Sequence, residues 1–268
     1  MKPISNTAFY CCGIRMLDAE SRKPICDDRY ARSFMDERGM EIFRRFGGEL
    51  GPNTSNVARH RYIDDYLRNR IATQPDIRIV LIGCGFDSRA FRIHGGEWLE
   101  FDEPQLIEYK NTRLPPSSCN NKLQRVAIDF GAESLADKLA PFTTDRLTLF
   151  IVEGVTMYLP DGALEGTLRT LKSLFPRHEV VADLMTRRFI DSFGRSIKRI
   201  IADMGADMVP PDAPDRPFME EGYVEFSRES IIGLSFQYRG LRWLGKLFGI
   251  LIPLAANGYT LRIFRPAT

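Results

Sequence analysis

The sequence predicts an α/β fold, a Rossmann-like parallel sheet covered by helices. In the middle of the chain, short runs rich in β-branched residues alternate with helical segments, as in parallel strands joined by right-handed crossovers. The first run ends in a glycine-rich turn, Gly83-Cys84-Gly85, at the place where such sheets bind nucleotides. At 268 residues, 44% of them hydrophobic, the chain can bury a full core as a single domain.

Before the first strand the pattern is mostly helical. It runs from about residue 5 to residue 73 and is interrupted by a turn-rich stretch at residues 47–56. Ser55 or Asn56 is a suitable N-cap for the helix that follows, and apolar residues recur along one face of that helix. We therefore expect residues 1–73 to form a helical cap.

Five buried strands are expected in order along the next part of the chain. They are the runs 77–82, 98–102, 123–129, 147–153 and 179–184. A helix at residues 162–174 follows a start signal at Pro160-Asp161, and residues 259–265 alternate as a closing strand should. Residues 74–190 would form the cofactor-binding half of the domain.

Residues 191–268 are expected to supply a lid after the fifth strand and the closing strands. The proline-rich segment 204–221 is predicted to be an extended loop of that lid. The apolar run 247–256 is far shorter than the roughly 20 residues of a membrane-spanning helix. We expect this run to be buried core or an edge of the lid.

Composition narrows the class of protein. The formal net charge is +2, from 37 basic and 35 acidic residues, which gives no general attraction for nucleic acid or for an anionic membrane. The five cysteines lack the CxxC or Cys/His spacing of a metal site, so we expect free thiols and no metal. The N-terminal segment lacks the apolar core of a secretory signal. These observations predict a cytoplasmic protein that contacts neither nucleic acid nor membrane.

The glycine turn and three acidic residues carry the chemistry. Ser88 stands where a dinucleotide-binding motif has its third glycine, which weakens the alternative of a nicotinamide oxidoreductase. Asp102, Asp129 and Glu153 each end a predicted strand, where side chains face a ligand bound at the sheet edge. Asp102 follows Gly85 at close to the ~20-residue spacing of an acid that binds ribose hydroxyls.

These segments resemble the leucine carboxyl methyltransferase superfamily, including its bacterial polyketide O-methyltransferase branch. The family's glycine motif LGxGxDTRxxRL is matched by LIGCGFDSRAFRI, and its EVDxP, VxxDL and EGxxMYLP elements by LEFDEP, VAIDF and VEGVTMYLP. Upstream, the patterns RTxxxDDxL and TAxxxAxxRA are matched by NVARHRYIDDYL and NTAFYCCGIRMLDA. The matches keep this order from about residue 6 to residue 160, and the chain after about residue 187 does not align.

The resemblance implies a class I S-adenosylmethionine-dependent O-methyltransferase, with S-adenosylhomocysteine as its product. Arg59 would pair with the methionine carboxylate of the cofactor, a two-point contact suited to guanidinium. The backbone of the turn Gly83-Cys84-Gly85 would contact the methionine moiety, and Glu153 would lie near its amino group. Arg15 matches an arginine of the family's cap.

The same resemblance assigns the nucleoside part of the cofactor and the transfer site. Asp102 would bind the ribose, and Asp129 with Phe130 would bracket the adenine. Tyr158 would either face the transfer site as a catalytic residue or pack in the core. The residues expected to bind the cofactor are thus Arg59, Gly83, Cys84, Gly85, Asp102, Asp129, Phe130 and Glu153.

The methyl acceptor is the least determined part of the hypothesis. None of the three histidines, His60, His94 and His178, lies in a motif that would orient it as a base, and His60 is expected on a helix surface. A carboxylate acceptor is already anionic at neutral pH and needs no base, whereas a phenol usually needs one. We therefore expect a carboxyl or hydroxyl group of a small apolar secondary metabolite. A protein C-terminal carboxyl methyltransferase and a catalytically silent cofactor-binding protein remain alternatives.

Overall fold

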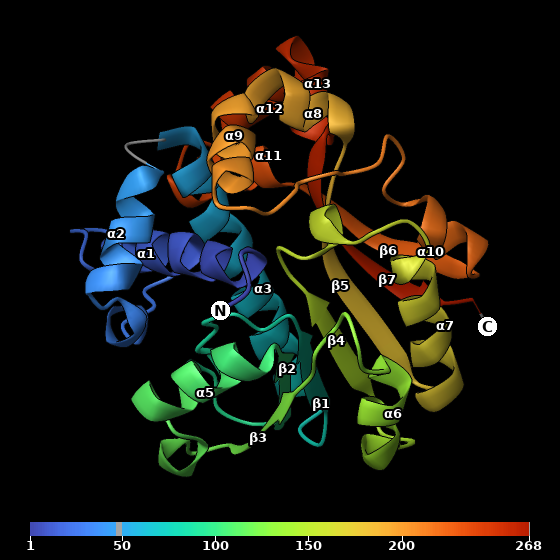
Figure 1. Ribbon diagram of the computed structural model, residues 1–268. Helices are drawn as coiled ribbons and strands as arrows, with labels where there is room; N and C mark the ends of the chain where they lie inside the picture. The colour runs from blue at the N-terminus through green and yellow to red at the C-terminus, as the bar shows by residue number, and fades with distance from the viewer. Residues whose placement is uncertain (47–49, 268) are drawn as a thin grey trace.

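The computed structural model describes residues 1–46 and 50–267 and has at its centre a seven-stranded sheet in the order β3-β2-β1-β4-β5-β7-β6 (Figure 1). The first five strands are parallel, and β7 pairs antiparallel with both β5 and β6. The strands are β1 (Arg78–Ile82), β2 (Glu97–Asp102), β3 (Lys122–Ala127), β4 (Thr148–Val152), β5 (His178–Met185), β6 (Tyr223–Ser230) and β7 (Tyr259–Pro266).

Buried side chains on both faces of the sheet explain why its strands were readable from sequence. Every residue of β1, β2, β4 and β5 is buried, as expected for parallel strands covered on two sides. The six predicted strands are therefore confirmed, with ends that shift by one or two residues. The strand β6 was missed because it lies at the sheet edge, where only Tyr223 is buried and partly buried positions alternate with exposed ones, with charged residues among both.

Helices cover the two faces of the sheet as separate layers. One face packs against α1 (Thr7–Ala19), α3 (Leu50–Thr73) and α5 (Pro104–Arg113). The other packs against α6 (Leu135–Leu139), α7 (Ala163–Leu174) and α10 (Arg216–Glu220). Two further helices, α2 (Glu37–Arg45) and the short α4 (Arg89–Arg92), complete the N-terminal half.

The helix α3 begins earlier than the sequence indicated. Residues 47–49 of the predicted turn-rich stretch lie outside the described residues, but α3 already begins at Leu50, so a helix N-cap at Ser55 or Asn56 is wrong. Pro52 belongs to the first turn of α3, where its missing N–H breaks no helical hydrogen bond. A proline that seemed to mark a turn thus marks the first turn of a helix.

Two insertions build the lid, whereas one was expected. The helices α8 (Arg187–Phe193) and α9 (Arg195–Asp203) follow β5, while α11 (Ile231–Tyr238), α12 (Arg242–Leu251) and α13 (Pro253–Asn257) lie between β6 and β7. Figure 1 shows all five gathered at one end of the molecule, beyond the carboxyl ends of the parallel strands. The segment 204–221 is irregular only in its first part, because it ends with α10.

The apolar run 247–256 is mostly exposed, so the expectation of buried core is wrong and the run belongs to the lid surface. Ile250 and Leu251 are 75% and 70% exposed, and only the alanines near its end are buried. The helix α12 carries apolar side chains on two sides, and only one of these faces the interior. No helix among the described residues is long and apolar enough to cross a membrane.

Candidate active site

The site lies where β1 and β4 diverge, the switch point of the sheet. From β1 the chain continues to β2 and β3 on one side, and from β4 to β5 on the other. Open α/β sheets bind ligands in the crevice outside this point, at the carboxyl ends of the strands. Gly83 follows β1, Asp102 ends β2 and Glu153 follows β4, so the sheet brings these predicted residues to one edge.

The turn after β1 requires glycine for its backbone. Gly83 and Gly85 have φ angles of 70° and 47°, and a Cβ on Gly83 would lie 2.6 Å from a methyl carbon of Val155. Cys84 between them is buried, and its N–H donates to the Phe101 carbonyl. The Gly83 N–H donates to the same carbonyl, so the N–H groups of Gly83 and Cys84 are both used within the fold.

The side chain of Asp102 is held against this turn. Its Oδ2 accepts from the Gly85 N–H at 2.6 Å and its Oδ1 from the Glu103 N–H at 2.8 Å. Burial raises the pKa of the Asp102 carboxyl to about 6, although these two N–H groups act in the opposite direction. Asp102 is thus positioned by the glycine turn and titrates close to neutral pH.

The residues predicted to bracket adenine are more open. Phe130 is 41% exposed, and Asp129 forms an ion pair with Lys2 at 2.6 Å. The same ammonium lies 2.8 Å from Glu103, so the N-terminal segment crosses from the loop after β3 to the end of β2. Hydrogen bonding to Lys2 lowers the pKa of Asp129.

The guanidinium of Arg59 joins the ends of β4, β5 and β7. Its Nε donates to Glu153 Oε1 at 2.9 Å, and its Nη1 donates to Asp183 Oδ2 at 2.7 Å and to the Tyr259 hydroxyl. Asp183 is fully buried, and its other oxygen accepts from the Gly154 N–H at 2.6 Å. Arg59 and Glu153, each predicted to contact the cofactor, therefore lie side by side in the structure. Asp183 and Tyr259 are further partners of Arg59 that were not predicted from the sequence.

A second buried arginine completes the charge balance of Glu153. Arg89 is fully buried; it donates to Glu153 Oε2 at 2.7 Å, to Asp64 Oδ1 at 2.6 Å and to Asp87. Burial alone would raise the pKa of Glu153, but the Arg89 and Arg59 guanidinium groups outweigh it and hold the pKa well below its usual range. Glu153 is therefore ionised at neutral pH.

His60 belongs to this ionic cluster, so its predicted place on a helix surface is wrong. The ring is 1% exposed, and its Nδ1 and Nε2 lie 2.7 Å from Arg89 Nη2 and Arg92 Nη2. Burial and the Arg89 charge lower the pKa of His60. His60, Asp87 and Glu153 are close enough together to bind a metal ion, but the Arg89 guanidinium contacts all three and occupies that place.

Arg15, the matched arginine of the cap, has a structural position. It is buried and donates to Asp28 Oδ2 at 2.9 Å and to the Phe86 carbonyl at 2.8 Å. Asp28 in turn lies 3.5 Å from Arg92, which also pairs with Asp64. These charges fasten the N-terminal cap to the loop after β1.

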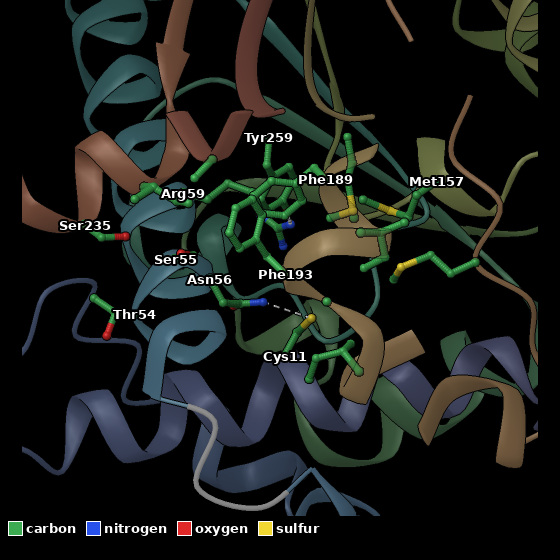
Figure 2. Close-up of a pocket in the computed structure, with 18 of the residues that line it drawn as sticks. Cys11, Thr54, Ser55, Asn56, Arg59, Met157, Phe189, Phe193, Ser235 and Tyr259 are labelled. Carbon is green, nitrogen blue, oxygen red and sulfur yellow. Dashed lines mark hydrogen bonds between the residues drawn. The ribbon is translucent and has the colours of Figure 1, made fainter. Parts of the chain in front are cut away.

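A cavity of about 540 Å³ opens beside Arg59 and continues under the lid. Figure 2 shows Arg59 and Tyr259 close together, with Phe189 and Phe193 of α8 and Met157 from the segment after β4 also drawn along the cavity. Most of the wall beyond Arg59 is apolar and comes from α8, α9, α11 and α12. The segment 204–221, predicted to be an extended loop of the lid, contributes Met208 to the cavity wall.

The end of the cavity near Arg59 is polar but holds no base. Among the described residues that line it there is no histidine and no carboxylate. Tyr158 reaches this wall beside Thr7 and Cys11, and burial raises the pKa of its phenol, so the hydroxyl is protonated at neutral pH. Tyr158 can therefore donate a hydrogen bond to a bound ligand but cannot accept its proton.

One polar group in this wall lacks a partner. Asn56 is 9% exposed; its Nδ2 lies 3.2 Å from Cys11 Sγ, and its buried Oδ1 has no hydrogen-bond partner (Figure 2). A buried amide oxygen without a partner is rare, and binding sites are a common place for one. Rotating the amide would exchange the positions of its oxygen and its NH₂ group, so Asn56 can present either an acceptor or a donor.

Comparisons with known proteins identify the family of the chain. A sequence model of a family described as leucine carboxyl methyltransferase matches residues 8–172. A protein of Mycolicibacterium gilvum (strain PYR-GCK), named "Putative S-adenosyl-L-methionine-dependent methyltransferase", is 28% identical over 195 residues. That alignment covers 64% of this chain and 63% of the relative. The chain thus spans less than two thirds of the length of this relative.

Solved structures share the fold at low sequence identity. A protein of the duf574 family from Streptomyces avermitilis superposes with a TM-score of 0.57 at 12% identity, over 96% of this chain and 97% of that one. A geranyl diphosphate C-methyltransferase from Streptomyces coelicolor A3(2), solved with S-adenosyl-L-homocysteine, gives a TM-score of 0.51 at 15% identity, over 82% and 86%. The predicted fold class, an α/β sheet of the class I methyltransferase type with a helical cap and lid, is confirmed.

Proposed function

Since the chain belongs to the leucine carboxyl methyltransferase family, we propose that it transfers a methyl group from S-adenosylmethionine to a carboxylate oxygen of a small apolar molecule. The observation that carries this proposal is the cavity, which is mostly apolar under the lid and ends beside Arg59 without a histidine or carboxylate among its described lining residues that could act as a general base. The acceptor would be a hydrophobic acid such as a secondary metabolite, in keeping with the polyketide-type branch that the sequence resembles.

The residues at the sheet edge fit the cofactor. Arg59 has Nη2 left to face the cavity beside Gly154, where it would bind a methionine carboxylate, and Glu153 would accept from the methionine ammonium. Asp102 would accept from the ribose hydroxyls. Asp129 and Phe130 would flank the adenine, with Lys2 close by. The positive φ angles of Gly83 and Gly85 let the chain turn sharply at the end of β1, at the sheet edge where the ligand would bind.

The chemistry needs positioning more than proton transfer. When bound, S-adenosylmethionine supplies a methyl group on a positively charged sulfur, which an oxygen nucleophile displaces in line. The apolar lid wall would hold the hydrophobic part of the acceptor and exclude water, while Tyr158 and Asn56 would orient its carboxylate by hydrogen bonds. A carboxylate gives up no proton in this reaction, so the absence of a base from the cavity wall is no obstacle.

Methylation products decide between this proposal and its alternatives. We expect incubation with S-adenosylmethionine and a panel of hydrophobic acids to give products heavier by one methylene, at a rate that is flat between about pH 6 and 8. The products should be methyl esters, which dilute hydroxide cleaves, whereas the methyl ethers formed from phenols resist it. Phenols in the panel should react at less than about a tenth of that rate, because the cavity offers no base.

Three results would contradict the proposal. Ether products, or a rate that rises with pH through the phenol range, would identify a hydroxyl acceptor. Preference for a peptide with a C-terminal leucine would identify a protein substrate. Binding of S-adenosylhomocysteine without turnover of any acceptor would favour a catalytically silent protein.

A pair of variants tests whether the cavity binds the acid. Phe193→Asp at the cavity wall should raise the KM of the acid, whereas Met219→Asp, equally exposed on α10, should not.

The titration of Asp102 predicts how cofactor binding depends on pH. Ribose hydroxyls donate hydrogen bonds, so the ionised carboxylate binds them better than the acid, and binding lowers the pKa from about 6. Affinity for S-adenosylhomocysteine should be constant above pH 6 and should fall by up to about tenfold per pH unit below it. Calorimetry at pH 5, 6 and 7 measures this. In Asp102→Asn the affinity should be lower and independent of pH over this range.

A further inference from the structure

The outer side of the lid presents a row of large apolar side chains to solvent. Trp243, Leu247, Ile250 and Leu251 follow one another at the spacing of one helical face on α12, and they are 65%, 46%, 75% and 70% exposed. On the inner side of the same helix, Phe248 lines the cavity. The outer row therefore has no part in the acceptor wall and forms a separate surface.

Basic residues lie beside this row, and the lid helices contain few acidic ones. Residues 231–258, which contain α11, α12 and α13, include three basic residues and no acidic residue. Residues 186–203, which contain α8 and α9, include five basic and two acidic residues. Together these helical segments of the lid carry a formal charge of +6, whereas the loop segment 204–221 carries −4 and the whole chain carries +2. Arg242 and Lys246 are exposed directly beside the apolar row.

We propose that the lid docks on an anionic lipid surface, with the apolar row of α12 inserted at the level of the lipid headgroups. Helices that lie in a membrane interface combine large apolar side chains, often including tryptophan, with basic residues along the flank. Arg242 and Lys246 would meet the lipid phosphates, and the other lid cations would add to the attraction. The sequence-wide charge gave no reason to expect this, because acidic residues elsewhere in the chain conceal the basic lid.

The shape and charge of the surface favour a membrane over other occupants. Figure 1 shows α12 and α13 at the outer end of the molecule, with α13 leading into β7. Ile250 and Leu251 are largely exposed at the end of α12, which suits insertion into a fluid layer, whereas a folded acidic protein would need matching pockets for both side chains. In a symmetric pair of chains, the same face would bring the lid cations against one another. Docking would hold the lid, and the cavity behind it, against the lipid.

A native fluorophore reports on this contact. The chain has two tryptophans, and Trp98 is fully buried in β2, so a change in emission on binding comes from Trp243. We expect the full chain to co-sediment with vesicles of phosphatidylcholine containing about 30% phosphatidylglycerol, with emission shifted to shorter wavelength. Vesicles of phosphatidylcholine alone should bind it at least about tenfold more weakly. No methyl donor is present, so the result is independent of the proposed activity.

Matched variants distinguish binding through the apolar row of α12 from attraction by net charge and from loss of the fold. Ile250→Asp with Leu251→Asp should weaken vesicle binding at least about tenfold, whereas Val224→Asp, exposed on β6, should not. Arg242→Glu with Lys246→Glu should weaken it more than Arg22→Glu with Lys23→Glu, which makes the same charge change on exposed residues of the cap. Circular dichroism checks that each variant is folded.

The proposal is overturned by any of three results. The first is no binding to anionic vesicles and no change in Trp243 emission. The second is equal loss of binding in the lid and cap charge variants, which would reveal attraction by net charge alone. The third is self-association that Ile250→Asp with Leu251→Asp abolishes, in the absence of vesicle binding, which would assign the surface to a second copy of the chain.

Discussion

Replacing Arg89 by methionine is expected to lower the free energy of unfolding by about 3–5 kcal/mol, the usual cost of removing one partner from a buried ionic group. The guanidinium contacts Asp64, Asp87 and Glu153 from a fully buried position. Methionine fills a similar volume, so the loss is electrostatic, because these carboxylates keep their charge and lose their main cation. Urea unfolding followed by circular dichroism measures the change.

Two further variants decide whether charge and geometry are the cause. Arg22→Met removes an exposed arginine from the cap and should change the stability by less than about 0.5 kcal/mol. Arg89→Lys keeps the charge but reaches fewer of the three carboxylates, so it should lie between methionine and the native protein. A loss below about 1 kcal/mol in Arg89→Met would show that Arg59 and Arg92 already neutralise the cluster.

The strands of this fold were predictable because most of them are buried on both sides. A parallel strand covered by helices needs a mainly apolar run, and β1 and β4 show one after their first residue. The edge strand β6 has the alternation of a strand, but its exposed positions include charged residues and its pairing with β7 is irregular between Glu225 and Ser227. Such a strand depends on its neighbour, which sequence pattern alone does not reveal.

In the lid, the sequence pattern identifies apolar residues but does not show which of them are buried. Composition marks residues 247–256 as apolar, but it does not say which side of α12 meets protein. Leu247 and Phe248 are neighbours in sequence, and one is exposed while the other lines the cavity. Only the arrangement of α8, α9 and α11 decides this, because these helices come from two separate insertions in the sheet.

The residues of the candidate site also fall into a group that the sequence predicts and a group that it does not. The acids Asp102 and Glu153 were identified from their positions at strand ends, which parallel sheets bring to a common edge. Asp183 lies within β5 and Tyr259 begins β7, so their meeting with Arg59 depends on the antiparallel pairing of those strands. One signal for Asp183 was available, since a carboxylate in the interior of a buried strand needs a cationic partner.

Replacing Arg59 by methionine should weaken binding of S-adenosylhomocysteine about 100-fold, because a buried carboxylate on the ligand would lose its cation. In the same variant, binding of 5′-methylthioadenosine should change by less than about threefold. This ligand keeps the adenine, ribose and sulfur but lacks the amino-acid part that Arg59 and Glu153 are proposed to hold. Calorimetry with the two ligands measures the contrast directly.

The second ligand also separates recognition from folding. Arg59 pairs with Glu153 and Asp183, so its loss leaves two buried carboxylates without this partner and lowers stability as well. If that damage reached the whole site, both ligands would bind more weakly to the same degree, and Arg59 would be a structural residue. Asp102→Asn provides the matched comparison: it should weaken both ligands alike, because the ribose is common to them. If Arg59→Met weakens only S-adenosylhomocysteine and Asp102→Asn weakens both ligands, the amino-acid part of the cofactor lies at β4 and the ribose at β2.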